Sequence, residues 1–131
     1  ANSDIYFDET LNLLKYSNLQ FNSTVITLSK WTDWTPPNNI ITLYPRIDSQ
    51  DAWIFKSPIN QDVIDLSVFY LGVPRCDNRL ASILINSGYK VVNPALKIHA
   101  IEFLSTYRET KLYDMKGAPI GETNNVFINS Q

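Results

Sequence analysis

The chain has few of the residues that mark several classes of protein. Cys76 is the one cysteine among 131 residues, which excludes an internal disulfide framework and a cysteine-rich zinc site. Neither sign of charge dominates, because 11 Lys and Arg against 13 Asp and Glu give a formal net charge of −2. No apolar run approaches the roughly 20 residues that span a bilayer. We therefore expect no nucleic-acid partner, no anionic-lipid surface and no membrane segment.

The composition is that of a globular domain. Hydrophobic residues make up 44% of the chain and charged residues 18%. The length suits one domain with a core of its own. Repeats, low-complexity tracts and linkers are absent from the sequence, so we expect a single domain over residues 1–131.

Short apolar runs alternate with helical patterns, which predicts a mixed α/β fold with a sheet flanked by helices. We expect strands at residues 5–7, 25–28, 40–44, 52–55, 67–70 and 89–92. A helix capped by Asp8 or Thr10 should run to about Tyr16. Residues 31–39 have the Pro and Asn pairs of a loop, residues 97–104 are apolar without a clear type, and residues 109–131 should form an irregular tail.

The best helix pattern covers residues 76–87. Leu80, Ile83 and Leu84 have the spacing that directs one helix face into a core, and Gly88 is well placed as the C′ residue. Asp77 lies at the helix start, directly after a loop that contains Gly72. A carboxylate there tends to stay ionised and can accept a proton, although Asp is also a preferred helix cap.

Further polar side chains lie at strand ends and loops, where α/β proteins place their ligands. Asp4 and His99 together could hold a hard divalent cation such as Mn²⁺ or Mg²⁺. Asp4 could equally be a turn residue, and a lone histidine is often a packing residue. Asp51 directly precedes an apolar strand, and Trp53 could stack on a sugar or belong to the core.

The order of these motifs resembles the GT-A class of glycosyltransferases over roughly residues 1–104. The matching segments are Asn2-Ser3-Asp4-Ile5, the Gly72 loop, Cys76-Asp77-Asn78-Arg79-Leu80, Gly88-Tyr89-Lys90-Val91, Asn93-Pro94 and His99. The resemblance implies transfer of a sugar from a nucleotide sugar to a hydroxyl of a carbohydrate or protein acceptor. It further implies inversion at the anomeric carbon and assistance by a divalent cation.

The same resemblance assigns roles to individual residues. Asp4 would belong to the metal motif and His99 would be the late metal ligand. Asp77 would be the catalytic base that takes the proton of the acceptor hydroxyl. The substrate-binding residues would be Asp51, Trp53, Gly72, Asn78 and Arg79.

Three departures from the class pattern accompany these assignments. Asn2 stands where a second carboxylate is common, and Cys76 stands where many members have Glu. In the class, a nucleotide-binding half precedes the metal motif, and that half is missing from this chain. The chain would then correspond to the C-terminal half of the domain and would have the other half as a partner. The alternatives are a carbohydrate- or partner-binding α/β module without turnover and a structural interaction domain.

Overall fold

The computed structural model describes residues 1–16, 22–32, 41–103 and 117–129. The fold is α/β, with two mixed sheets and three helical segments among these residues. The first sheet has the strand order β5-β2-β6 and the second sheet has the order β1-β7-β3-β4. The strands are β1 (Ile5–Phe7), β2 (Thr24–Leu28), β3 (Lys30–Thr32), β4 (Thr42–Leu43), β5 (Ala52–Ile54), β6 (Lys90–Val92) and β7 (Ala100–Glu102), and the helices are the 3-10 helix η1 (Glu9–Tyr16), α1 (Gln61–Leu66) and α2 (Cys76–Asn86).

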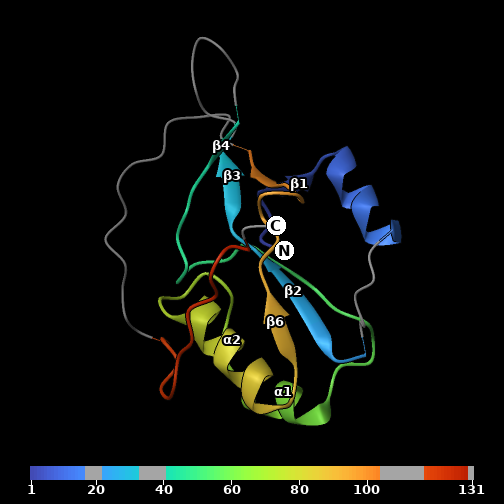
Figure 1. Ribbon diagram of the computed structural model, residues 1–131. Coiled ribbons are helices and arrows are strands. Elements are labelled where there is room, and N and C mark those ends of the chain that lie inside the picture. Colours follow the sequence, from blue (N-terminus) through green and yellow to red (C-terminus); the bar gives the residue numbers. More distant parts are fainter. Residues whose placement is uncertain (17–21, 33–40, 104–116, 130–131) are drawn as a thin grey trace.

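The two sheets are joined by one nearly continuous stretch of extended chain. Ser29 alone separates β2, in the first sheet, from β3, in the second, and Figure 1 shows β3 above β2. All five residues of β2 are buried, and Ser29 is fully buried as well. The chain therefore passes from one sheet to the other within the protein interior.

The first sheet separates two hydrophobic clusters. β2 runs antiparallel to β5 and parallel to β6. On one face Val25 packs with Val63 of α1 and with Ile83 and Leu84 of α2. Figure 1 shows α1 and α2 together beside this sheet. The alternation of side chains along a strand directs Ile26 to the opposite face.

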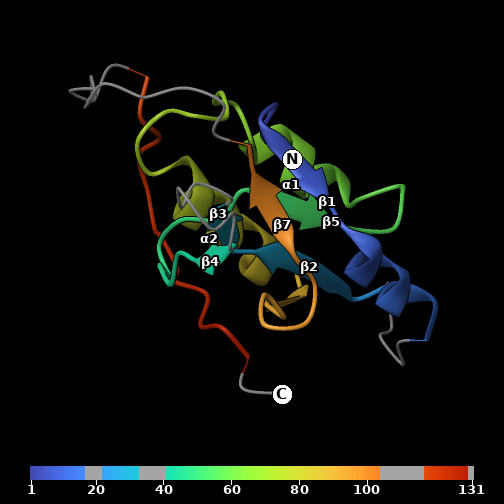
Figure 2. The same ribbon diagram turned by 90° about the horizontal axis from the view of Figure 1, so that it is seen from above.

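The second cluster lies between that opposite face, the strands β1 and β7, and the helix η1. Its buried members are Ile26, Leu28, Ala52, Ile98 and Ala100, and side chains of β1 and η1 pack against them. β7 runs antiparallel to β1 and parallel to β3. Figure 2 shows β7 and β1 side by side, as their pairing requires.

The C-terminal segment (residues 117–129) is irregular but is tied to the rest of the fold. Its backbone N–H groups donate from Asn124 to the carbonyl of Asn78 and from Val126 to that of Ile47, both at 2.9 Å. The Arg79 guanidinium donates to the carbonyl of Glu122 at 2.9 Å. Val126 is buried. The segment therefore covers the start of α2 and reaches the polar loop before β5.

Most of the expected elements are present within the described residues. The strands at 5–7, 25–28, 52–55 and 89–92 and the helix at 76–87 are confirmed within a residue or two, and part of the 40–44 strand is present as β4. Gly88 has a φ of 94°, which confirms it as the left-handed residue after α2. The expected helix at 10–16 is present as the 3-10 helix η1.

Two expectations were wrong. Residues 67–70 do not form a strand, because no neighbouring strand pairs with them, and Val68 and Tyr70 are almost fully exposed. The short helix α1 immediately before them was not expected. Trp31 lies in β3 rather than in a loop, since β3 pairs with both β4 and β7, whereas the rest of the expected loop (33–39) lies outside the described residues.

Residues 100–102 of the apolar stretch 97–104 form strand β7, and residue 104 lies outside the described part. No helix in the described ranges is long and apolar enough to cross a membrane.

The end of α2 gives a test of the fold. Gly88→Ala should lower the free energy of unfolding by about 1 kcal/mol, because a Cβ disfavours the left-handed backbone. The added Cβ itself would have no neighbouring side chain or more distant backbone atom within 4 Å, so the cost is that of the backbone conformation. Ser87→Ala, one residue earlier at φ −89°, should change stability by less than about half as much. Urea unfolding of both variants measures the difference. Equal stability of wild type and Gly88→Ala would show that α2 ends elsewhere.

Candidate functional site

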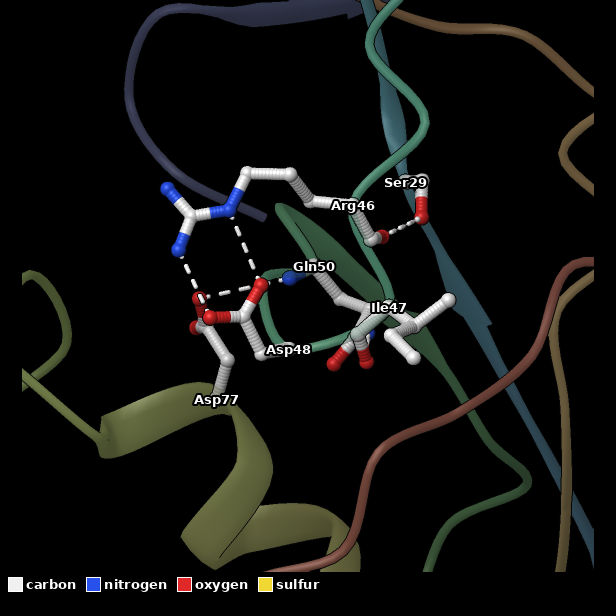
Figure 3. A network of polar contacts seen from close by, with 6 residues as sticks. All are labelled: Ser29, Arg46, Ile47, Asp48, Gln50 and Asp77. Carbon is white, nitrogen blue, oxygen red and sulfur yellow. Dashed lines mark hydrogen bonds and ion pairs between the residues drawn. The ribbon is translucent and has the colours of Figure 1, made fainter.

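The loop between β4 and β5 (residues 44–51) brings polar groups to the junction of the two sheets. The Ser29 hydroxyl donates to the carbonyl of Arg46 at 2.9 Å. The carbonyl of Ile47 accepts from the side-chain amide of Gln50 at 2.8 Å and from the Val126 N–H at 2.9 Å. Figure 3 shows this loop beside the first turn of α2. These bonds fix the backbone that presents Asp48, Gln50 and Asp51.

Asp77 points from the first turn of α2 toward this loop. Its Oδ2 accepts the backbone N–H of Gln50 at 3.2 Å (Figure 3). Its Oδ1 lies 3.3 Å from Sγ of Cys76. Burial raises the pKa of the Asp77 carboxyl group, although bonds from Cys76, Ser49 and Gln50 oppose the shift. The N-cap residue is Arg75, at φ 68° and without a side-chain cap. Asp77 is therefore not the helix cap, and its carboxylate joins α2 to the loop.

Asp51 lies at the other end of the same loop and is also buried. Its N–H donates to the carbonyl of Leu28 at 2.9 Å, and its Oδ1 accepts the side-chain amide of Asn2 at 2.8 Å. Burial raises the pKa of Asp51 to about 6; Lys30 opposes the shift, while the charge of Asp77 adds to it. The structure thus brings Asp51 and Asp77, both predicted as site residues, within electrostatic range of each other.

Lys30 supplies the positive charge among these acids. Its Nζ lies 2.6 Å from Oε2 of Glu102, and the two side chains are 22% and 5% exposed. Burial lowers the pKa of Lys30, but the pair with Glu102 and the charges of Asp51 and Asp4 raise it above its ordinary value. We call Asp4, Asp51, Asp77, Glu102 and Lys30 the carboxylate cluster. It contains four acids and one base.

Arg46 and Asp48 form a separate pair at the exposed rim of the loop. Two bonds of 2.9 and 2.6 Å join the guanidinium to the carboxylate. The bonds from Arg46 hold the pKa of Asp48 below its ordinary value. Asp48 therefore keeps its charge and adds to the negative potential that acts on Asp77.

The structure does not bring Asp4 and His99 together. The carbonyl of Asp4 accepts the N–H of Phe103, whereas the His99 ring lies beside Asp8, with Nδ1 2.8 Å from Oδ2. Because Asp4 lies beside Phe103, the four-residue step from His99 to Phe103 separates His99 from Asp4, which corresponds to about 13 Å of extended chain. His99 also contacts the ring of Trp31, at 4.7 Å between centroids. Within the described ranges, no group of three or more His, Cys, Asp or Glu side chains could hold a metal ion.

The remaining predicted residues lie apart from the cluster. Gly72 is exposed in the loop before α2, with φ 90°. Asn78 and Arg79 hold the C-terminal segment through the carbonyl of Asn78 and the guanidinium of Arg79. Trp53, two residues after Asp51, lines two apolar hollows.

Two members of the cluster, Lys30 and Glu102, were not predicted from the sequence. They meet because β3 and β7 are parallel neighbours in which Lys30 pairs with Ala100 and Thr32 with Glu102. The sequence contains one feature that could have pointed to Glu102 as a site residue, namely its position as a charged residue within the apolar stretch 97–104.

Comparisons with protein-family models, with curated proteins and with solved structures find no match for this chain. Its function is therefore argued from the geometry of its own residues.

The raised pKa of Asp51 predicts how stability depends on pH. A carboxyl group whose pKa is higher in the folded than in the unfolded state stabilises the fold at low pH, and this contribution is lost as the pH rises through the folded-state value. Between pH 4 and 7 the stability of Asp51→Asn should therefore rise relative to wild type, by up to about 3 kcal/mol. Urea unfolding at both pH values measures this change.

Asp48→Asn is the matched control, because the pKa of Asp48 is lowered in the folded protein. Its stability relative to wild type should stay level or fall over the same interval. A parallel rise for both variants would contradict the assignment of the effect to buried Asp51.

The pair of Lys30 and Glu102 predicts strong thermodynamic coupling. Lys30→Met leaves a nearly buried carboxylate without its ammonium partner and should lower the free energy of unfolding by about 3 kcal/mol or more. The double variant Lys30→Met/Glu102→Leu should be less destabilised than the sum of the single variants, as measured by a double-mutant cycle. Additive effects would mean that the ion pair contributes nothing to the fold.

Proposed function

We propose that the chain carries the acceptor-activating part of a sugar-transfer site, at which a sugar passes from a nucleotide sugar to an acceptor hydroxyl with inversion. The observation that supports the proposal most is the proximity of Asp51 and Asp77. These residues come from different elements, both were predicted as site residues, and burial raises the pKa of both. Two interacting carboxyl groups with raised pKa values are typical of acid–base sites.

Asp77 is the proposed base. A raised pKa makes its carboxylate a stronger proton acceptor, because the ideal pKa of a general base lies near the operating pH. The Gln50 N–H and the Cys76 thiol fix the orientation of the carboxylate. In the proposed reaction Asp77 takes the proton of the acceptor hydroxyl while the hydroxyl oxygen attacks the anomeric carbon. The bond from that carbon to the diphosphate oxygen breaks, and nucleoside diphosphate leaves.

Asp51 and the other acids of the carboxylate cluster are proposed to orient the sugar or the acceptor. Carboxylate oxygens accept hydrogen bonds from hydroxyl groups, and Asn2 and Lys30 hold Asp51 and Glu102 in place. In this proposal the donor is a nucleotide sugar and the acceptor a carbohydrate or a protein.

The metal part of the expectation does not fit the described geometry. Asp4 and His99 lie too far apart to share one cation, and Nδ1 of His99 already contacts Oδ2 of Asp8. We therefore derive no step through Mn²⁺ or Mg²⁺ at these two residues.

A second candidate is a carbohydrate- or partner-binding module without turnover. Asp77 accepts bonds from Gln50, Ser49 and Cys76, which would also suit a structural carboxylate that only joins α2 to the loop. Loss of transfer without loss of ligand binding separates the two candidates.

Asp77→Asn provides that test. An amide keeps an oxygen that can accept the Gln50 N–H, but it cannot take a proton. Release of nucleoside diphosphate from a panel of nucleotide sugars, with acceptor present, should therefore fall by about 10²- to 10⁴-fold. Donor affinity should stay within about twofold of wild type, since the base acts on the acceptor.

Asp62→Asn is the control, because it removes an exposed carboxylate on α1 to which no role in transfer is assigned. It should retain near-wild-type rates. If Asp77→Asn transfers sugar as fast as wild type, or if wild type binds sugars without turnover, the module without turnover is the better description.

A further inference from the structure

An apolar hollow of about 310 Å³ lies between the first sheet and the helices α1 and α2. Its walls come from β2, β5, α1, α2 and the turns that flank α1. The lining residues that matter for the argument are Val25, Trp53, Val63, Ile64, Ser67 and Leu84. This size is at the lower end of the range of small-molecule sites.

The lining defines the chemistry of an occupant. None of the described residues that line the hollow carries a charge, and among them only Ser67 and the indole of Trp53 have hydrogen-bonding side chains. A free sugar would leave most of its hydroxyl groups without partners there, at a cost for each buried group. The hollow therefore suits an uncharged and largely apolar molecule.

Two polar atoms at this lining lack partners. Nε1 of Trp53 and Oγ of Ser67 are buried, and neither has a hydrogen-bond partner among the described residues. An indole N–H only donates, and a buried donor without an acceptor costs free energy. Trp53 also lines the second hollow.

We propose that this hollow is a binding site for a small, uncharged and largely apolar molecule that carries a hydrogen-bond acceptor. The apolar part of the molecule contacts Val25, Val63 and Leu84, and its acceptor takes the N–H of Trp53 or the hydroxyl of Ser67. This site does not depend on the proposed sugar transfer, because its lining includes no member of the carboxylate cluster.

The probe is 1-acetonaphthone, a neutral bicyclic ketone, with 1-ethylnaphthalene as a probe of similar size without an acceptor. Binding is followed by the indole N–H resonances in ¹H–¹⁵N spectra, with Trp53→Phe identifying the resonance of Trp53. The ketone should shift that resonance saturably. The resonance of Trp31, whose N–H already donates to the carbonyl of Ala95 at 2.7 Å, should stay in place.

Two matched variants locate the site. Ile64 lines the hollow and is 53% exposed, whereas Leu66 on the same helix is 50% exposed and does not line it. Ile64→Trp should fill the hollow and weaken binding by about tenfold or more, and Leu66→Trp should change it by less than about twofold. Ser67→Ala should weaken binding of the ketone more than binding of the hydrocarbon.

Equal affinity of Ile64→Trp and Leu66→Trp would overturn the proposal, as would a ketone-induced shift at Trp31 in place of Trp53. If Ile64→Trp does not fold, the wild-type spectra decide, because absence of a saturable shift at Trp53 overturns the proposal by itself. Loss of sugar transfer in Asp77→Asn would leave these binding results unchanged, so the two proposals fail separately.

Discussion

The hydrogen bonds around Ser29 hold the two sheets in one structure. The N–H of Ser29 donates to Oδ1 of Asn93 at 3.2 Å, the Asn93 amide donates back to Oγ of Ser29 at 2.9 Å, and both residues are fully buried. Because the chain leaves β2 and enters β3 at Ser29, its backbone cannot be satisfied by either sheet alone. Oδ1 of Asn93 accepts the Ser29 N–H, and the carbonyl of Arg46 accepts the Ser29 hydroxyl. The positions of Lys30 and Asp51 follow from this junction.

The carboxylate cluster shows how a fold tolerates several acids in one place. Asp51, Asp77 and Glu102 are each largely withdrawn from water, and Lys30 offers one positive charge to them. The protein accommodates the excess through hydrogen bonds from Asn2 and Gln50 and through the raised pKa values of Asp51 and Asp77, which favour the neutral forms of these two acids.

Local sequence signals predicted the local structure well. The spacing of Leu80, Ile83 and Leu84 and the glycine at position 88 were sufficient to place α2, since both depend on neighbours within one or two turns. The strand expected at 67–70 failed for the opposite reason, because a strand exists only where another strand pairs with it. Asp77 and Asp51 were identified from their positions at the starts of elements. Which charges surround them depended on the pairing of β3 with β7, and no short-range pattern contains that pairing.

The pairing of His99 illustrates the same limit. A single histidine after an Asn-Pro turn gives no indication of its neighbour, and the antiparallel pairing of β1 with β7 places Asp8 beside it. Asp4 directly precedes β1, at the opposite end of the strand from Asp8, and its charge acts on Lys30 instead. A one-residue difference in strand register would have changed both assignments.

The C-terminal segment has a consequence for how the protein forms during synthesis. The loop that presents Asp48, Gln50 and Asp51 receives the N–H of Val126 at the carbonyl of Ile47, and Asn129 donates to the carbonyl of Asn93. A ribosome makes residues 44–51 long before residues 126–129, so the emerging chain holds the junction of the sheets without these partners. The polar centre of the molecule is therefore completed last, after both hydrophobic clusters have been synthesised.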